Sequence, residues 1–196
     1  MNSSVAIVGA GAIGAWLADA FDRAGWRVSL VARGATLNVI LSSGLCVTQG
    51  GEVRISRPSA GSPGELGVHD YVVLCVKAQH LPGLAHQLKS LIGAATVVIS
   101  GTNGIPWWFF QDFGGPIANQ ILKSVDPGGS QAAVFPSDRT LGSVVHASVR
   151  VTSPGNAHVV AADRFILGAP GAALSEKIES VVQALHQGGV NAQISA

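Results

Sequence analysis

The hydrophobic pattern at the start of the chain predicts a strand, a turn and a helix in close succession. Val5-Ala6-Ile7-Val8 is an apolar run of strand length, and Gly9-Ala10-Gly11-Ala12-Ile13-Gly14 follows it directly. Apolar residues then recur every three or four positions, which predicts a helix over about 12–24 that ends before Gly25. The run 26–31 predicts a second strand. This order of elements is typical of a parallel β-α-β unit.

Strand-like and helical patterns keep alternating along the rest of the chain. We expect further strands at 70–76, 95–100 and 190–195, and further helices at 34–43, about 80–92 and about 174–187. A hairpin at the edge of the sheet is expected around Gly50-Gly51, and 143–152 should pair with 157–167 as antiparallel strands. Residues 59–64 are predicted to be loop, and 111–135 irregular. The predicted fold class is α/β: a Rossmann-like, doubly wound, mostly parallel sheet with helices on both faces and a few antiparallel strands.

The spacing of the first glycines, G-x-G-x-x-G between a strand and a helix, predicts a dinucleotide-binding turn. Gly9 permits the tight turn, Gly11 lets a pyrophosphate approach the backbone, and Gly14 lets the helix pack closely on the strand. The pyrophosphate would then meet the free N–H groups at the start of the helix. We therefore expect the cofactor to be bound by Gly9, Ala10, Gly11, Ala12, Ile13 and Gly14. A glycine turn with a purely structural role is the alternative.

The end of the second strand indicates which cofactor is preferred. An acidic side chain there would accept hydrogen bonds from the adenosine ribose of NAD, but this chain has Val31-Ala32-Arg33. No carboxylate is present to repel a 2′-phosphate, and Arg33 can hold one by a charge-assisted hydrogen bond. The sequence thus favours NADP(H) over NAD(H). If Arg33 is only a solvated loop residue, this preference loses its basis.

Composition and charge narrow the function classes further. The net charge is +1 and only 12% of the 196 residues are charged, against about a quarter in an average protein, which argues against nucleic acid as a partner. No apolar run approaches the roughly 20 residues that a membrane span needs. Cys46 and Cys75 lack metal-ligand spacing and are expected to be buried, reduced thiols in a cytoplasmic protein. His146 and His158 also lack such partners, so we predict structural roles for both and no metal.

Two polar residues follow predicted strands at the edge where the glycine turn lies. Lys77 comes after the strand 70–76, and Asn103 comes after 95–100. Open α/β sheets bind ligands at the carboxyl ends of their strands, so the two side chains are candidates for the nicotinamide end of the site. A lysine can hold a ribose or substrate group there, and an asparagine amide can both donate and accept hydrogen bonds. Taken singly, each is more often a solvated lysine or a turn asparagine.

Taken together, motifs along nearly the whole chain resemble the ketopantoate reductases (2-dehydropantoate 2-reductases). They are the glycine turn, Val31-Ala32-Arg33-Gly34, Cys75-Val76-Lys77-Ala78, Asn103-Gly104-Ile105-Pro106-Trp107-Trp108, and the stretches 142–146, 153–158 and 165–168. The resemblance implies reduction of ketopantoate to pantoate by NADPH, in pantothenate and coenzyme A synthesis. It also implies that Gly9, Gly11, Gly14 and Arg33 bind the adenosine-phosphate end. Lys77 and Asn103 would serve the nicotinamide end, with Asn103 positioning the substrate and Lys77 contacting the cofactor rather than acting in catalysis.

The family also has a C-terminal helical domain that supplies the lysine general acid and much of the dimer contact, and we expect it to be absent here. Residues 1–196 would then form the NADP(H)-binding domain alone, closed by the helix and strand of about 174–195. A non-catalytic NADP(H)-binding module is one alternative. A related reductase of another small 2-keto acid is a second, because Thr102 stands where the family often has glutamine. The aromatic run 107–110 is expected to be a core or interface helix or a substrate lid, and a homodimer is compatible with it.

Overall fold

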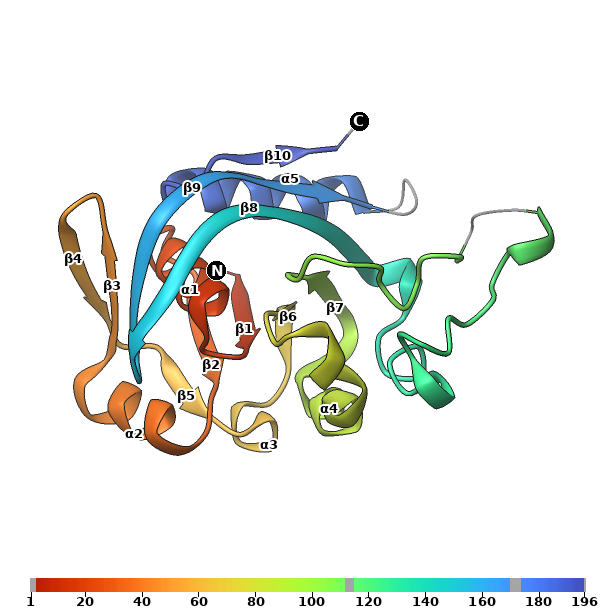
Figure 1. Ribbon diagram of the computed structural model, residues 1–196, viewed down its shortest axis with the longest axis horizontal. Helices are drawn as coiled ribbons and strands as arrows, with labels where there is room; N and C mark the ends of the chain where they lie inside the picture. The colour runs from red at the N-terminus through yellow and green to blue at the C-terminus, as the bar shows by residue number, and fades with distance from the viewer. Residues whose placement is uncertain (1–2, 112–114, 170–173, 196) are drawn as a thin grey trace.

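A computed structural model describes residues 3–111, 115–169 and 174–195, and its main feature is one mixed ten-stranded sheet (Figure 1). The strand order is β4-β3-β9-β8-β7-β6-β1-β2-β5, and β10 pairs with β9 off this path. The predicted fold class is confirmed: most of the strand pairs are parallel, helices cover both faces, and a few pairs are antiparallel.

The parallel half of the sheet is built around β1 (Ser4–Val8), every residue of which is buried. β2 (Arg27–Val31) pairs on one side of β1 and β6 (His69–Leu74) on the other. β5 (Ser59–Gly61) extends the sheet beyond β2, and β7 (Ile92–Ser100) extends it beyond β6. The chain therefore reverses direction across the sheet at β1, which is the switch point where such folds bind ligands.

The other half of the sheet is a long curved hairpin. β8 (Thr140–Ser153) begins parallel to β7, and β9 (Asn156–Gly168) returns antiparallel to it, as predicted. β3 (Leu45–Gln49) and β4 (Glu52–Ser56) form the predicted edge hairpin, and β10 (Ala192–Ile194) pairs with β9. Figure 1 shows β8 and β9 arching over the parallel strands toward β3 and β4.

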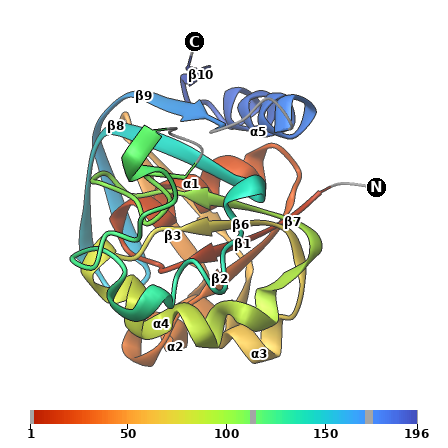
Figure 2. The ribbon, with the colours of Figure 1, turned by 90° about the vertical axis from the view of Figure 1, so that its right-hand side faces the viewer.

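Helices cover both faces of the parallel strands. α1 (Ala12–Arg23) and α5 (Ser175–Gln187) lie on one side, and α4 (Leu81–Leu88) lies on the other, with α2 (Gly34–Ser43) and α3 (Pro63–Leu66) nearby (Figure 2). Alternate residues of β1 enter two separate apolar clusters: Val5 and Ile7 pack with α1 and α5, while Ala6 and Val8 pack with α4. Two buried faces explain why Val5 to Val8 are all apolar rather than alternating with polar residues.

Three sequence predictions need correction. Residues 59–64 were expected to be loop, but they contain β5 and the start of α3; backbone bonding to β2, rather than an apolar pattern, forms β5. The helix expected over 80–92 ends at Leu88, and a 3-10 turn, Lys89–Leu91, leads into β7 earlier than predicted. The aromatic run consists of turns rather than a helix.

The segment 111–135 is irregular where it is described, as predicted. Its regular pieces are short 3-10 turns, Gly115–Ile117 and Pro127–Gly129, and a further one, Ser137–Arg139, precedes β8. Asp126 organises part of this segment, because its carboxylate accepts hydrogen bonds from the backbone N–H groups of Gln131 (2.9 Å) and Ala132 (3.0 Å). A 3-10 turn, Ala78–His80, lies at the carboxyl end of β6 and leads directly into α4.

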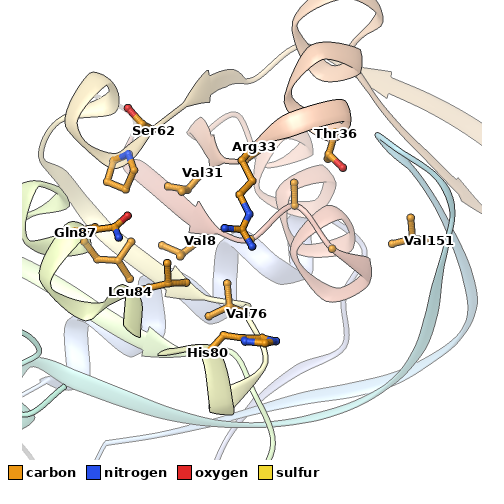
Figure 3. A pocket seen from close by; sticks show the side chains of 16 residues that line it. Val8, Val31, Arg33, Thr36, Ser62, Val76, His80, Leu84, Gln87 and Val151 are labelled. Atoms are coloured by element: carbon orange, nitrogen blue, oxygen red, sulfur yellow. The ribbon is translucent and has the colours of Figure 1, made fainter. Parts of the chain in front are cut away.

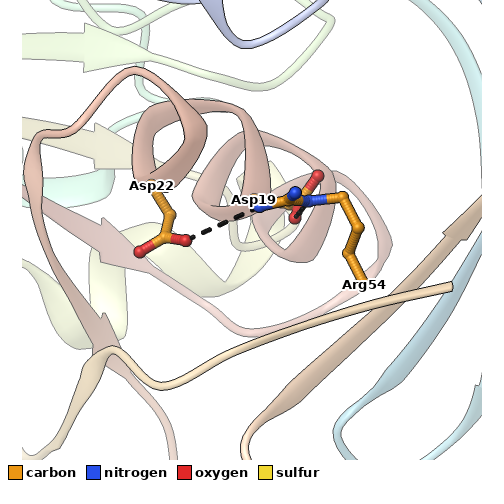
Figure 4. Close-up of polar contacts among 3 residues, drawn as sticks. All are labelled: Asp19, Asp22 and Arg54. Atoms are coloured by element: carbon orange, nitrogen blue, oxygen red, sulfur yellow. Dashed lines mark hydrogen bonds and ion pairs between the residues drawn. The ribbon is translucent and has the colours of Figure 1, made fainter.

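An ion pair fixes the edge hairpin to the central helix. The Nε of Arg54 on β4 lies 3.0 Å from a carboxylate oxygen of Asp19 on α1, and another of its nitrogens lies 3.9 Å from Asp22 (Figure 4). The side chain of Asp19 is only 6% exposed, whereas that of Arg54 is 42% exposed. Burial, and then the neighbouring Asp19 charge, raise the pKa of Asp22, while Arg54 opposes the shift. Arg54 therefore neutralises a carboxylate that has little access to water.

We expect Arg54→Met to lower the free energy of unfolding by about 1–3 kcal/mol, because it leaves the buried Asp19 carboxylate without its partner. Arg164→Met is a matched control: Arg164 is 44% exposed and lies 3.2 Å from Asp163, but that carboxylate is 69% exposed. Loss of such a surface pair should cost at most about 1 kcal/mol. Urea unfolding of both variants measures the difference, and equal losses would contradict the role given to Asp19.

Candidate functional site

The turn after β1 has the backbone geometry that its glycines predict. Gly9 has a φ of +102°, a conformation that side chains with a Cβ rarely adopt, and its N–H donates to the carbonyl oxygen of Val31 (3.2 Å). A Cβ on Gly9 would lie 2.9 Å from Cγ1 of Val76 and 3.2 Å from its backbone nitrogen. The turn is therefore held tightly between the ends of β2 and β6.

Gly14 and Gly11 are glycines for different reasons. A Cβ on Gly14 would collide with the carbonyl oxygen of Gly9, so the fold itself requires glycine there. A Cβ on Gly11 would meet no atom within 4 Å. Gly11 is also the N-cap of α1, at an ordinary φ of −83°. No described part of the protein leaves too little room for a larger residue at Gly11. A ligand lying close to the backbone, in contrast, would require glycine there.

The glycine turn opens onto a cavity of about 450 Å³, within the size range of small-molecule sites (Figure 3). Its walls come from the carboxyl ends of β1, β2 and β6, the first turn of α2, and α4. Apolar side chains such as Val8, Val31 and Leu84 alternate there with the polar groups of Arg33 and Thr36. This is the place and composition expected of a nucleotide site in an open α/β sheet.

Three helices begin at this cavity. Their N-cap residues are Gly11 for α1, Arg33 for α2 and His80 for α4, and all three line it. None of these N-caps makes a side-chain capping hydrogen bond. At α1 and α2 the free N–H groups and the positive ends of the helix dipoles therefore favour anions. At α4 the first N–H groups are already bonded within the turn Ala78–His80, because His80 donates to Lys77 and Leu81 donates to Ala78. Among the described residues that line the cavity there is neither Asp nor Glu.

Arg33 is exposed, and Figure 3 shows its guanidinium extending into the cavity from the start of α2. Thr36 lines the cavity from the same helical turn, and Ser62 lines it from the N-cap of α3. Ser62 donates its hydroxyl and its N–H to the carboxylate of Glu65 (2.6 and 2.7 Å), and these bonds lower the pKa of Glu65. Thr36 and Ser62 therefore line the cavity together with Arg33, and the Ser62 hydroxyl is already bonded to Glu65.

Lys77 and Asn103 lie at the predicted edge of the sheet but outside the walls of this cavity. Lys77 is exposed and follows β6 directly. Asn103 donates from Nδ2 to the carbonyl oxygen of Val145 (2.9 Å) and accepts from its N–H at Oδ1 (2.8 Å). The amide therefore ties the loop after β7 to β8, and one N–H and one lone pair are left over for a ligand.

Beside Asn103, a second hollow of about 360 Å³ lies between the loop after β7 and the hairpin β8–β9. Thr102, Trp108 and Phe109 line it on the loop side, and Val144 and Ile166 line it on the hairpin side. No described residue in its lining is titratable.

The aromatic run 107–110 contains both core and surface residues. Trp107 is 3% exposed and packs on Phe135, whereas Phe109 is 40% exposed.

The remaining candidate groups are placed as follows. Both cysteines are free, but both residues are partly exposed, so the prediction that they are buried is wrong. Burial of the thiol itself raises the pKa of Cys75 to about 12, which makes it a poor nucleophile. Within the described ranges, no three His, Cys, Asp or Glu side chains lie close enough together to hold a metal ion. No helix in those ranges is long and apolar enough to cross a membrane.

Several residues that line the cavity were not predicted from the sequence. Thr36, Ser62, His80, Leu84 and Gln87 all line it. One usable signal existed: Ser62 and Glu65 have the spacing of a capping box ahead of Pro63, which marks the start of a helix at the strand ends. The apolar wall on α4 gives no such signal, because its leucines have the same helical spacing as ordinary core residues.

This arrangement defines the chain as a Rossmann-like α/β domain. A sequence profile described as ketopantoate reductase PanE/ApbA matches residues 5–107, and the chain belongs to this family. It is 38% identical over 192 residues to a 2-dehydropantoate 2-reductase of Mesorhizobium japonicum, an alignment that covers 97% of this chain and 59% of that protein.

Solved structures agree with this assignment. A structure from Ralstonia solanacearum MolK2, assigned as a ketopantoate reductase, has a TM-score of 0.93 and 36% identity, and the match covers 100% of this chain and 61% of that one. A D-mandelate dehydrogenase with NADH and anilino(oxo)acetate shares the fold, with a TM-score of 0.77 at 19% identity over 98% of this chain and 56% of that one. The chain thus spans about three fifths of the length of these first relatives.

Gly11 and Gly14 should respond differently to an added methyl group. Gly11→Ala should change the free energy of unfolding by no more than about 1 kcal/mol, since the space is open, but weaken NADPH binding by about tenfold or more. Gly14→Ala should destabilise the fold by about 2 kcal/mol or more through its clash with Gly9. Thermal unfolding and NADPH fluorescence titration separate the two effects. Unchanged NADPH affinity in Gly11→Ala would contradict a cofactor lying against this turn.

Proposed function

We propose that this chain binds NADP(H) and forms the cofactor-binding half of an enzyme that reduces 2-dehydropantoate (ketopantoate) to pantoate. The observation that carries the proposal is the cavity at the switch point, where the glycine turn and three helix N-termini converge and no described lining residue is acidic. Membership of the family supports the reaction. The Mesorhizobium relative, by its name, carries out this reduction.

The residues present fit this cofactor. Gly9 and Gly11, with the first N–H groups of α1, would hold the pyrophosphate. Arg33 and the start of α2 would hold the 2′-phosphate, and Lys77 and Asn103 would serve the nicotinamide end. NADPH, once bound, supplies the hydride that reduces the ketone. The protein's part is to bind and orient the cofactor and to hold the polar groups of the substrate.

The preference for NADP(H) over NAD(H) rests on Arg33, and the D-mandelate dehydrogenase that shares the fold was solved with NADH. Arg33→Ala should weaken NADPH binding by about 10- to 150-fold, which corresponds to one charge-assisted contact, and change NADH affinity by less than about twofold. Arg164→Ala, an exposed arginine on β9, is the control. Fluorescence titrations with both nucleotides measure the effect. Equal affinity of the wild-type chain for NADH and NADPH would contradict the proposed preference.

A non-catalytic NADP(H)-binding module is the second candidate, and one observation favours it. Ketone reduction needs a proton donor of suitable pKa near the substrate, yet no described residue lining the hollow or the small crevice around Asn103 is titratable. A related reductase of another small 2-keto acid also remains a candidate, since Thr102 lines this hollow. We propose that the proton donor lies outside residues 1–196.

If the cofactor site lies within residues 1–196 and the proton donor lies outside them, the chain should bind NADPH without turning it over. The 196-residue chain should bind NADPH but should not oxidise it above the enzyme-free rate when ketopantoate is added, because the general acid is missing. Absorbance at the reduced-nicotinamide band measures the rate, and a longer parent protein is the positive control and can be compared on other 2-keto acids. Robust turnover by the 196-residue chain would contradict both the missing acid and the binding-module alternative.

A further inference from the structure

The cavity holds a second basic side chain that the proposed function does not use. His80 is the N-cap of α4, is exposed, and lines the same cavity as Arg33. Figure 3 shows the two side chains entering from opposite sides, Arg33 from the start of α2 and His80 from the start of α4, and Val76 lines the same cavity. An imidazole in this place can face the same phosphate as the guanidinium.

Resting on the proposed function, we propose that His80 is a specificity-determining residue that contacts the 2′-phosphate of NADP(H) in its protonated form. A protonated imidazole donates a charge-assisted hydrogen bond to a phosphate oxygen, whereas the neutral form has one donor and no charge. Protonation of His80 and binding of the phosphate therefore favour one another.

The other charged groups around His80 do not compete for this role. Arg33 faces it from the start of α2, and Lys77 lies three residues earlier in the chain, but arginine and lysine ordinarily keep their charge between pH 6 and 8.5. On the α3 side, the carboxylate of Glu65 is bound to Ser62. Gln87 of α4 lines the cavity and is uncharged. Histidine is the residue type that changes charge within this pH range.

The sign of the pH dependence follows from this coupling. Because the protonated imidazole favours the bound phosphate, the selectivity for NADPH over NADH should rise as the pH falls. The phosphate opposes this trend, since its second pKa is near 6 and its own protonation weakens binding in acid. If only the phosphate titrated, selectivity would stay level or fall toward acid pH. A rise toward acid pH therefore reports the imidazole.

The test is the ratio of the NADH and NADPH dissociation constants, measured by fluorescence titration of the 196-residue chain at pH 6.0 and 8.5. In the wild type the ratio should be about five- to tenfold higher at pH 6.0. In His80→Gln, which keeps a polar group, and His80→Phe, which keeps an aromatic face, it should be equal or lower at pH 6.0. Both variants should retain their affinity for NADH within about twofold at pH 8.5.

Other outcomes overturn the proposal in distinguishable ways. If His80 instead stacks on the adenine, His80→Phe retains wild-type affinity for both nucleotides and His80→Gln loses affinity for both equally. If selectivity for NADPH is present but does not depend on pH in the wild type, the role of His80 is wrong and the role of Arg33 stands. If the wild type shows no selectivity at either pH, the proposed 2′-phosphate site is itself wrong.

Discussion

The close packing of α1 on the turn after β1 is the constraint on which the rest of the structure depends. Gly14 lies so near the carbonyl oxygen of Gly9 that no side chain fits between helix and turn. This contact sets the direction of α1, and hence where its free N–H groups point. The opposite end of the helix is fixed in the same manner, because a Cβ on Gly188, the C-cap of α5, would collide with the backbone of Ala20. Backbone packs against backbone at both ends, so the position of α1 does not depend on the rotamers of long side chains.

The curved half of the sheet is a consequence of that central helix. α1 is buried on most of its surface, with Trp16 packed edge-on against Phe165 of β9 and Asp19 paired with Arg54 of β4. A helix that is apolar nearly all round needs cover on every side, and the hairpin β8–β9 supplies it by arching over α1 (Figure 1). The one charged side chain on the buried surface is also the one that anchors the edge hairpin. The tip of the long hairpin returns to the cavity, where Val151 lines the wall, so that residues far apart in the chain share one site.

The sequence allowed the fold to be predicted where a local rule decides the structure. Glycine spacing located the turn, the helix over 34–43 was placed at its observed bounds, and Gly50-Gly51 marked the hairpin, where both glycines have positive φ. The prediction failed where pairing with a neighbouring strand, rather than the local sequence, forms the element. Ser59–Gly61 has no apolar pattern and becomes a strand because β2 offers free backbone groups. The same limit applies to the site. Strand ends indicated Arg33, Lys77 and Asn103, but not that Val145 binds the Asn103 amide, nor that α4 places His80 opposite Arg33.

The structure also separates the groups that bind from the groups that would react. In the proposed function, the turn, the helix N-termini and Arg33 would act on the adenosine half of a dinucleotide, which is chemically unchanged by hydride transfer. Such contacts stabilise the ground state and the transition state equally, so they set affinity and cofactor choice rather than the rate of the chemical step. The hollow beside Asn103, where a substrate would lie next to the nicotinamide, offers hydroxyl, amide and apolar groups but no proton donor among its described residues. For the proposed reaction, the proton donor would therefore come from outside the described lining of that hollow, while the contacts proposed for the cofactor lie within the chain.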